Sequence, residues 1–268
     1  MPVRLSLPPT FGSVLLDSRR PQIGMWLCTG SALVAEICAG SGLDWLLIDM
    51  EHAPNGLESV TAQLQAVAAY PITPLVRVPV NDPVIIKQVL DLGARNILVP
   101  MVGSADEAAA AVRAVRYPPA GVRGVGSALG RAARWNRVDG YLQNAASHVS
   151  VFVQIESSAA VEAVEEIASS GVDGIFVGPS DLAASMGQLG QQEHPDVVAA
   201  VERCIAAGRR LGVPVGVNAF APAIAESYLA AGVSFILVGA DVSLLARGSE
   251  AFADRFIDGD SDGDRASY

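Results

Sequence analysis

The sequence predicts a (β/α)8 TIM barrel, a single α/β domain in which eight parallel strands alternate with helices. One pattern recurs eight times along the 268 residues: a short β-branched run, a glycine or polar break, and an alanine-rich amphipathic stretch. The strand-like runs, such as WLLI, NILV and FILV, are apolar throughout, which is typical of parallel strands buried on both faces. Glycine follows several of the helical stretches just before the next strand, as expected where a helix ends.

Each predicted strand is followed by a predicted helix. The strands are expected at Gln22–Cys28, Asp44–Asp49, Thr73–Pro79, Asn96–Met101, Val149–Glu156, Asp173–Gly178, Val213–Asn218 and Val233–Gly239. The helices are expected at Ser31–Ala39, Leu57–Ala69, Pro83–Leu92, Ala105–Val115, Ala159–Ser169, Asp196–Leu211, Pro222–Ala230 and Ser243–Phe256. A doubly wound open sheet is the alternative, but no GxGxxG motif follows the first strand, which disfavours a nucleotide-binding version of that fold.

The chain divides into an N-terminal segment, 1–19, the barrel, 20–256, and an acidic tail, 257–268, that we expect to be disordered. The longest connection, 116–148, lies between the fourth and fifth strands and is rich in glycine and arginine. A connection of this length inside a barrel indicates a functional loop or an oligomer contact.

The composition disfavours several classes of partner. A formal net charge of −10 argues against binding to nucleic acid or to an anionic membrane. No apolar run is long enough for a membrane span, and the first residues contain no signal-peptide pattern. The three cysteines, Cys28, Cys38 and Cys204, match neither a zinc motif nor a CxxC motif, so we expect core cysteines in a cytoplasmic protein.

Polar side chains gather at the predicted carboxyl ends of the strands, where barrels of this kind place their active sites. These residues are Asp49, Glu51 and His52 after the second strand, Arg77 on the third, Gln154 and Glu156 on the fifth, Ser180 and Asp181 after the sixth, and Asn218 on the seventh. In a chain with 17% charged residues, four acids beside one arginine and one histidine indicate a catalytic mouth rather than solvated strand ends.

The acids at this mouth suit a hard divalent cation such as Mg²⁺ or Mn²⁺. Glu156 and Asp181 follow neighbouring strands, so their carboxylates are expected to converge on one ion; pairing with Arg77 is the alternative. His52 is suited to proton transfer, and a buried histidine held by Asp49 is the alternative. Arg77 suits a substrate carboxylate or a developing enolate.

The basic residues are 17 arginines and a single lysine, Lys87. Enolate chemistry next to a carbonyl proceeds either through a metal ion or through a lysine Schiff base. Lys87 is predicted in the middle of a helix rather than at a strand end. The sequence therefore favours the metal-dependent route and predicts no Schiff base.

Seven segments make the chain similar to the HpcH/HpaI aldolase family. They are RPQIGMWL (20–27), DWLLIDMEHAPN (44–55), NDPVIIKQVLDLGA (81–94), LVPMV (98–102), RYPPAGVRGVGSALGRAARWNR (116–137), VQIE (153–156) and GVDGIFVGPSDLAASMG (171–187). The resemblance implies a metal-dependent (class II) pyruvate aldolase on a (β/α)8 barrel, usually a homohexamer with the C-terminal helix exchanged between subunits. The implied reaction is the reversible cleavage of 4-hydroxy-2-oxo acids, such as 4-hydroxy-2-oxoheptanedioate, to pyruvate and an aldehyde, such as succinic semialdehyde. A 2-keto-3-deoxy sugar acid aldolase and, more distantly, a thioester lyase of the citramalyl-CoA type are the alternatives.

The resemblance also implies roles for single residues. Glu156 and Asp181 resemble the ligands of a divalent metal ion, Mg²⁺, Mn²⁺ or Co²⁺. Arg77 resembles the residue that binds pyruvate, and His52 resembles a base that acts through water with Asp91 as its partner. The further substrate-binding residues are Trp26, Gln154, Ser180 and Asp181, and Asp49 and Glu51 are expected to support them.

Two residues do not follow directly from the family resemblance. Asp91 is predicted at the end of a helix, near the amino-terminal end of the barrel, so it should not reach His52 of the same chain. It serves either as a helix cap or in the site of a neighbouring subunit, and we favour the second. Met50 stands where the family commonly has glycine, and its thioether is expected to narrow the mouth and affect the choice of aldehyde.

Overall fold

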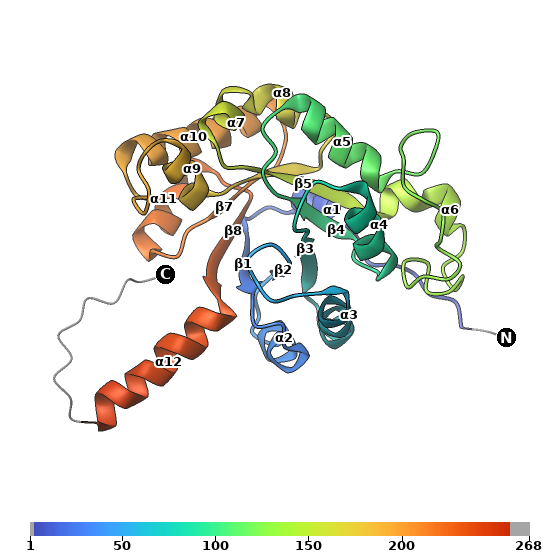
Figure 1. The fold of residues 1–268 in the computed structure, drawn as a ribbon, viewed down its shortest axis with the longest axis horizontal. Helices are drawn as coiled ribbons and strands as arrows, with labels where there is room; N and C mark the ends of the chain where they lie inside the picture. Colours follow the sequence, from blue (N-terminus) through green and yellow to red (C-terminus); the bar gives the residue numbers. More distant parts are fainter. Residues whose placement is uncertain (1–2, 258–268) are drawn as a thin grey trace.

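The computed structural model describes residues 3–257 (Figure 1). Its eight strands form a closed barrel in chain order, and each strand is parallel to its two neighbours. They are β1 (Gln22–Leu27), β2 (Trp45–Asp49), β3 (Thr73–Arg77), β4 (Asn96–Val99), β5 (Ser150–Ile155), β6 (Gly174–Val177), β7 (Val215–Asn218) and β8 (Phe235–Ala240). The predicted (β/α)8 barrel is therefore confirmed. Apart from Ile257, the predicted acidic tail lies outside the described residues.

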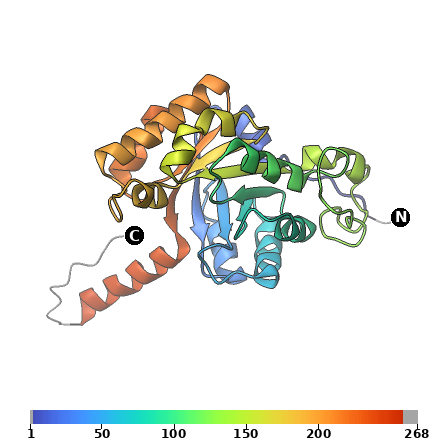
Figure 2. The same cartoon turned by 45° about the horizontal axis from the view of Figure 1, so that its top comes forward.

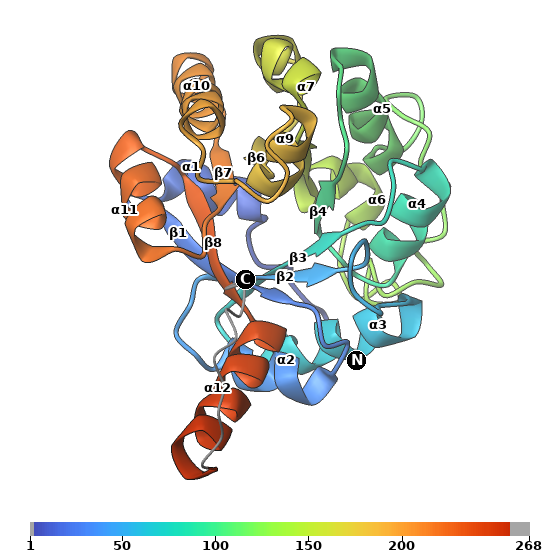
Figure 3. The same cartoon turned by 60° about the vertical axis from the view of Figure 1, so that its left-hand side comes forward.

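Helices surround the barrel (Figure 2, Figure 3). They are α1 (Phe11–Asp17), α2 (Ala32–Ala39), α3 (Leu57–Ala66), α4 (Pro83–Asp91), α5 (Ala105–Val115), α6 (Tyr141–Asn144), α7 (Ser158–Glu162), α8 (Val164–Ala168), α9 (Pro179–Ser185), α10 (Pro195–Leu211), α11 (Pro222–Ala231) and α12 (Asp241–Phe256), with 3-10 helices η1 (Val67–Ala69) and η2 (Ala145–His148). The single helix predicted over Ala159–Ser169 is divided into α7 and α8, because Ala163 leaves the helical conformation at φ −92° and ψ 10°. Within the described residues, no helix combines the length and the apolar character needed to cross a membrane.

Large side chains fill the barrel interior, and glycines on neighbouring strands make room for them. A Cβ on Gly24 of β1 would lie 2.5 Å from the ring of Trp45, and a Cβ on Gly216 of β7 would overlap the ring of Phe235. Both rings are fully buried, and their centroids are 5.6 Å apart. The barrel is therefore a packed core beneath the mouth rather than a pore.

Helix α1 closes the amino-terminal end of the barrel, in a segment where the sequence predicts no helix. The side chain of Phe11 is completely buried. Its ring lies 5.2, 5.6 and 5.4 Å from the rings of Trp45, Phe152 and Phe235. The N-terminal segment thus contributes a residue to the interior of the barrel.

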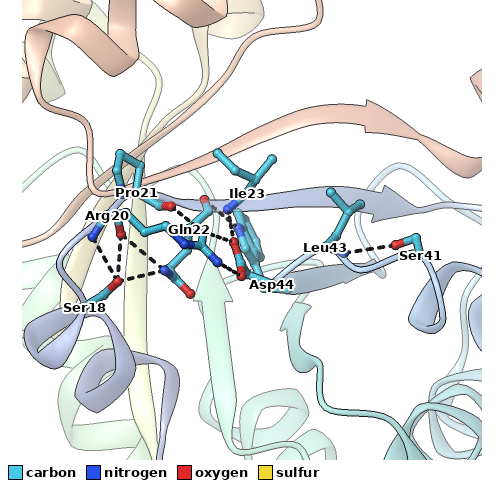
Figure 4. A network of polar contacts seen from close by, with 9 residues as sticks. Ser18, Arg20, Pro21, Gln22, Ile23, Ser41, Leu43 and Asp44 are labelled. Carbon is cyan, nitrogen blue, oxygen red and sulfur yellow. Dashed lines mark hydrogen bonds and ion pairs between the residues drawn. The ribbon is translucent and has the colours of Figure 1, made fainter.

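An ion pair at the same end joins the starts of β1 and β2 (Figure 4). Arg20 donates from Nη1 and Nη2 to Asp44 at 2.7 and 2.6 Å, and the N–H of Ile23 donates to the same carboxylate at 2.9 Å. The hydrogen bond from Arg20 is the main reason that the pKa of Asp44 is lowered. The Arg20 side chain is 62% exposed, so the pair contributes little stability.

Helix α12 projects away from the barrel (Figure 1, Figure 2). Only its first residue, Asp241, is buried, whereas Leu244 and Phe252 are 65% and 68% exposed. Helix α2 exposes two further apolar side chains, Leu33 and Ile37. The helix predicted after the eighth strand is therefore present, but most of its apolar surface has no partner within the described part of this chain.

Candidate active site at the carboxyl end of the barrel

Arg77 is the centre of the polar network at the mouth. It is 5% exposed, and its Nε and Nη2 each donate to the carboxylate of Asp49 at 2.8 Å. The parallel register pairs Asp49 of β2 directly with Arg77 of β3, which places their side chains next to each other. The guanidinium carbon also lies 4.4 Å from the ring centroid of Trp26 on β1. The two-point pairing and the ring together fix the plane of the guanidinium.

Glu51 and Gln154 lie at the remaining edge of Arg77. Its Nη1 is 2.8 Å from Glu51 Oε2 and 3.4 Å from Gln154 Oε1. The contact with Glu51 lacks hydrogen-bond alignment, and this buried oxygen has no hydrogen-bond partner among the described residues. Burial raises the pKa of Glu51, although Arg77 opposes the shift. Such an oxygen can accept a further donor or contact a cation.

Glu156, which follows β5, is a buried carboxylate without an ion-pair partner in the described part of the chain. It is 3% exposed and accepts hydrogen bonds from the N–H of Met101 and from Gln154 Nε2, each at 2.6 Å. Burial raises the pKa of Glu156 to about 7, and the charges of Glu51 and Asp181 add to the shift. A charged carboxylate in this position is therefore destabilised until a cation compensates it.

The turn from β6 into α9 brings Asp181 toward Glu156. A Cβ on Gly178 would lie 2.9 Å from Glu156 Oε2 and 3.1 Å from Gln154 Nε2. Glycine at this position therefore allows the backbone of the turn to lie against these two side chains. Asp181 lies exposed in the first turn of α9, where its charge acts on Glu156. The neighbouring Ser180 is also exposed, and its hydroxyl donates to Gln192 at 2.7 Å.

His52 lies at the rim of the mouth. Its side chain is 66% exposed, and its Nε2 is 3.8 Å from Glu51 Oε2. The alternative of a buried histidine held by Asp49 is therefore wrong, because His52 is exposed and Asp49 pairs with Arg77. An accessible imidazole beside a carboxylate can exchange a proton with a bound molecule.

Asn218 and Asp241 extend the network to β1, and the sequence alone assigned neither of them a role. Trp26 Nε1 donates to Asn218 Oδ1 at 2.7 Å, which holds the ring beside Arg77. Asp241 is 2% exposed and accepts from the N–H groups of Cys28 and Thr29 at 2.8 and 3.0 Å. Its position directly after the apolar strand β8 is the sequence signal by which it is recognisable.

Asp91 lies away from this network, at the end of α4. Helix α4 runs from the mouth back to the start of β4, so Asp91 and His52 lie at opposite ends of the barrel. The Asp91 carboxylate is 3.1 Å from Nη2 of Arg123, whose side chain is completely buried. This placement matches the expectation that Asp91 does not reach His52 within one chain.

Met50 does not narrow the mouth, so that expectation is wrong. Successive residues of a strand point to opposite faces, and the side chain before it, Asp49, points inward to Arg77. Met50 is 8% exposed and belongs with Ile48 to the apolar core outside the barrel. The single lysine, Lys87, lies inside α4 and away from the strand ends, as predicted.

The donor groups of the mouth fit a hard divalent cation. No three His, Cys, Asp or Glu side chains within residues 3–257 are arranged to hold a metal ion by themselves. Glu156 and Asp181 nevertheless supply two carboxylates from neighbouring elements, and Glu156 has no cationic partner there. Such ions accept carboxylate oxygens together with water and substrate oxygens, so this pair leaves positions open for a ligand.

A closed (β/α)8 barrel with a cluster of polar side chains at the carboxyl ends of its strands is the architecture of a TIM-barrel enzyme. Comparison with known proteins identifies the family to which the chain belongs. The chain belongs to the HpcH/HpaI aldolase/citrate lyase family, whose family model matches residues 22–248. The matched region contains all eight strands and every residue of the mouth network described above.

Individual relatives narrow the comparison. The chain is 53% identical over 242 residues to 4-hydroxy-2-oxo-heptane-1,7-dioate aldolase from Escherichia coli, with 90% of this chain and 92% of the relative covered. Among solved structures, an HpcH/HpaI aldolase/citrate lyase family protein from Burkholderia cenocepacia is 46% identical, with a TM-score of 0.87 over 91% of this chain and 97% of that chain. Citrate synthase SbnG is 27% identical, with a TM-score of 0.81 over 92% and 96% of the two chains. Proteins with this fold therefore carry more than one named activity.

Proposed function

We propose that the protein is a divalent-metal-dependent pyruvate aldolase that cleaves 4-hydroxy-2-oxoheptanedioate to pyruvate and succinic semialdehyde. The similarity to the Escherichia coli aldolase supports the substrate. The observation that carries the chemistry is buried Glu156, which has no ion-pair partner in the described residues and lies near Asp181 and Arg77. In the cleavage direction the C4 hydroxyl loses its proton, the C3–C4 bond breaks, and its electron pair forms the pyruvate enolate, which a proton then converts to pyruvate.

Glu156 and Asp181 would hold the divalent cation, with Mg²⁺, Mn²⁺ and Co²⁺ as the candidates. When bound, the cation would supply a Lewis acid that polarises the keto group of the substrate. Because the pKa of Glu156 is about 7, its carboxyl group would release its proton to solvent when such a cation binds near neutral pH.

Arg77 would bind pyruvate and stabilise the negative charge of the enolate. Asp49 engages its Nε and Nη2, so Nη1 is the group that faces Gln154 and Glu51. Gln154 would orient the substrate from β5. The ring of Trp26 would hold the guanidinium in place by packing against its face. Ser180 and Asp181, in the first turn of α9, would contact the substrate.

His52 would remove the proton of the C4 hydroxyl through a water molecule and return it in the reverse direction. Its exposed position at the rim leaves room for that water. Asp91 of the same chain lies at the opposite end of the barrel, so the partner subunit's Asp91 would orient the imidazole. Buried Arg123 would fix the Asp91 carboxylate for this role.

The projecting helix α12 supports the proposal that the protein is a homo-oligomer, a hexamer, in which this helix is exchanged. In a complete (β/α)8 barrel the last helix covers β8 and β1, next to the helix after β1. Here Leu244 and Phe252 of α12 are exposed, and so are Leu33 and Ile37 of α2. Light scattering tests this: Phe252→Asp is expected to lower the molar mass, whereas an unchanged mass would contradict exchange.

Cytoplasmic location is part of the same proposal. All three cysteines are free, and burial raises the pKa of Cys28 and of Cys204 to about 12, so these thiols stay neutral. Free cysteines are compatible with a reducing compartment.

The direct test is an aldolase assay on the full chain, with pyruvate release coupled to NADH oxidation. Activity is expected to disappear after EDTA treatment and to return with Mg²⁺, Mn²⁺ or Co²⁺. Full activity in EDTA, or trapping of pyruvate on Lys87 by borohydride, would contradict the metal-dependent route. A panel of aldehydes with pyruvate as donor separates this substrate from the 2-keto-3-deoxy sugar acids, because the proposal expects succinic semialdehyde to react fastest.

A further inference from the structure

A cavity of about 370 Å³ opens at the amino-terminal end of the barrel, at the starts of β3 and β4. It lies at the opposite end from the mouth, and it is separate from every residue of the candidate active site. Part of its wall is apolar and includes Leu64, Val67 and Ile72. The wall also contains three arginines, Arg95, Arg131 and Arg134.

Two of these arginines are packed together over a glycine. A Cβ on Gly93 would lie 2.8 Å from Arg134 Nη1 and 2.9 Å from Arg131 Nη1, so the two guanidinium groups are direct neighbours. Gly93 follows α4 with φ +96°, and its missing side chain is what admits them. The long connection between the fourth and fifth strands thus places the positive charges of Arg131 and Arg134 side by side in the wall of the cavity.

None of the three arginines pairs with a carboxylate in the described residues. The pKa of Arg95 and that of Arg131 are each lowered to about 10, mainly by burial, and the charge of Arg134 contributes to both shifts. Burial also lowers the pKa of Arg134. Three partly buried cations without an ion-pair partner in the described residues are costly to the fold unless a ligand compensates them.

A structural role accounts for Arg131 but not for Arg134. Arg131 donates to the carbonyls of Leu92 and Leu64 at 3.2 and 3.3 Å, at the C-terminal ends of α4 and α3, where positive charge is favourable. Arg134 donates only to the carbonyl of Arg131 in its own loop, at 2.8 Å. It does so from a left-handed backbone conformation, φ 50°, which the surrounding structure must hold.

We propose that this cavity binds a small organic anion, namely an apolar body that carries one carboxylate or phosphate group. The planar guanidinium groups of Arg134 and Arg95 would receive the anionic group, because their geometry matches both carboxylate and phosphate oxygens. The apolar wall around Leu64 and Ile72 would cover the body of the ligand. The volume is within the range of about 300–1,000 Å³ that is usual for small-molecule sites.

Isothermal titration calorimetry on the full chain tests this with four probes: benzoate, phenyl phosphate, acetate and inorganic phosphate. Saturable binding is expected for benzoate or phenyl phosphate, and whichever binds more tightly identifies the preferred anionic group. Acetate and inorganic phosphate should bind about tenfold more weakly or not measurably, because they lack the apolar body. Equal affinities across the four probes, or no saturable binding by any, would overturn the proposal.

Substitutions locate the probe. Arg134→Gln is expected to weaken binding by about tenfold or more, and Arg95→Gln provides a second variant if the first does not fold. Arg209→Gln, at an exposed arginine of α10, removes the same charge and should leave the affinity unchanged. Unchanged binding in both cavity variants would refute the assignment.

A repeat titration with saturating Mg²⁺ and pyruvate separates the cavity from the mouth. The probe should bind as before, whereas displacement by pyruvate would place it at Arg77 and refute the cavity site. This measurement records binding rather than turnover, so its outcome is independent of whether the proposed aldolase activity is found.

Discussion

The two ends of the barrel carry opposite excesses of charge. At the carboxyl end, the four acids Asp49, Glu51, Glu156 and Asp181 lie close to one another, and one guanidinium, that of Arg77, pairs with the first two. At the amino-terminal end, three arginines line a cavity, and none of them pairs with a carboxylate in the described residues. The mouth is therefore suited to a cation and the opposite cavity to an anion. The net charge of −10 does not show this difference between the two ends, because it contains no information on where the charges lie.

The largest expected effect is at the mouth. Glu156→Gln removes the buried carboxylate but keeps its shape, so we expect loss of the bound divalent metal and a fall in turnover of about a thousandfold or more. Metal content by mass spectrometry and the coupled assay measure the two effects. Glu226→Gln, at an exposed position of α11, is the matched control. A Glu156→Gln protein that retains its metal would remove this residue from the metal site.

His52→Ala should separate proton transfer from metal binding. Turnover is expected to fall by about 10²- to 10⁴-fold, the usual loss when a general base is removed, while the metal stays bound. His194→Ala is the control, because this side chain caps the start of α10 and contacts Asp196 rather than a residue of the mouth network. Loss of metal from the His52→Ala protein would show that the imidazole belongs to the metal site instead.

The pH dependence of the free energy of unfolding tests the acidic carboxyl end of the barrel. The pKa of Glu156 is raised from 4.5 to about 7, so the folded chain binds more protons than the unfolded chain between these values. The free energy of unfolding of the metal-free protein should therefore fall as the pH rises from 4.5 through 7, by about 3 kcal/mol from this group. Urea unfolding with EDTA measures it, and Glu156→Gln should flatten the slope. The same slope in this variant would assign it to another group.

The smallest expected effect has the opposite sign and lies at the amino-terminal end. The pKa of Asp44 is lowered, mainly by the hydrogen bond from Arg20, so its contribution is present above 3.8 and is lost as the pH falls through the lowered value. Asp44→Asn should therefore reduce stability at neutral pH but not in strong acid. The change should be smaller than that from Glu156, because Arg20 is 62% exposed. Urea unfolding at both pH values checks this, and an equal loss in strong acid would contradict it.

Most of the fold is readable from the chain because each strand is a short apolar run. The predicted strands overlap all eight observed strands, with ends that differ by no more than two residues. Helix α1 was not predicted, because seven residues with one phenylalanine carry too little periodicity. The projection of α12 away from the barrel is also not predictable from the sequence. Its amphipathic pattern indicates that its apolar face needs a partner, but not where that partner lies.

Part of the mouth was also readable, because parallel strands place their carboxyl ends at one edge. Arg77, Glu156 and Asp181 are predicted at the mouth for this reason. The pairing of Asp49, rather than Glu156, with the guanidinium of Arg77 is not predicted, because it depends on the register of β2 against β3. Met50 is expected to narrow the mouth, but its side chain lies in the apolar core outside the barrel.

The sequence by itself determined the periodic βα pattern, the family, and the residue types gathered at the strand ends, because these are local properties of the chain. Only the tertiary structure decided which charges are compensated. Glu156 lacks a cation and Arg134 lacks an anion within the described residues, since the partners of a charge are set by contacts between distant segments. The arginine cavity exists for the same reason: Arg95, Arg131 and Arg134 meet only when the barrel closes and the long loop returns to Gly93.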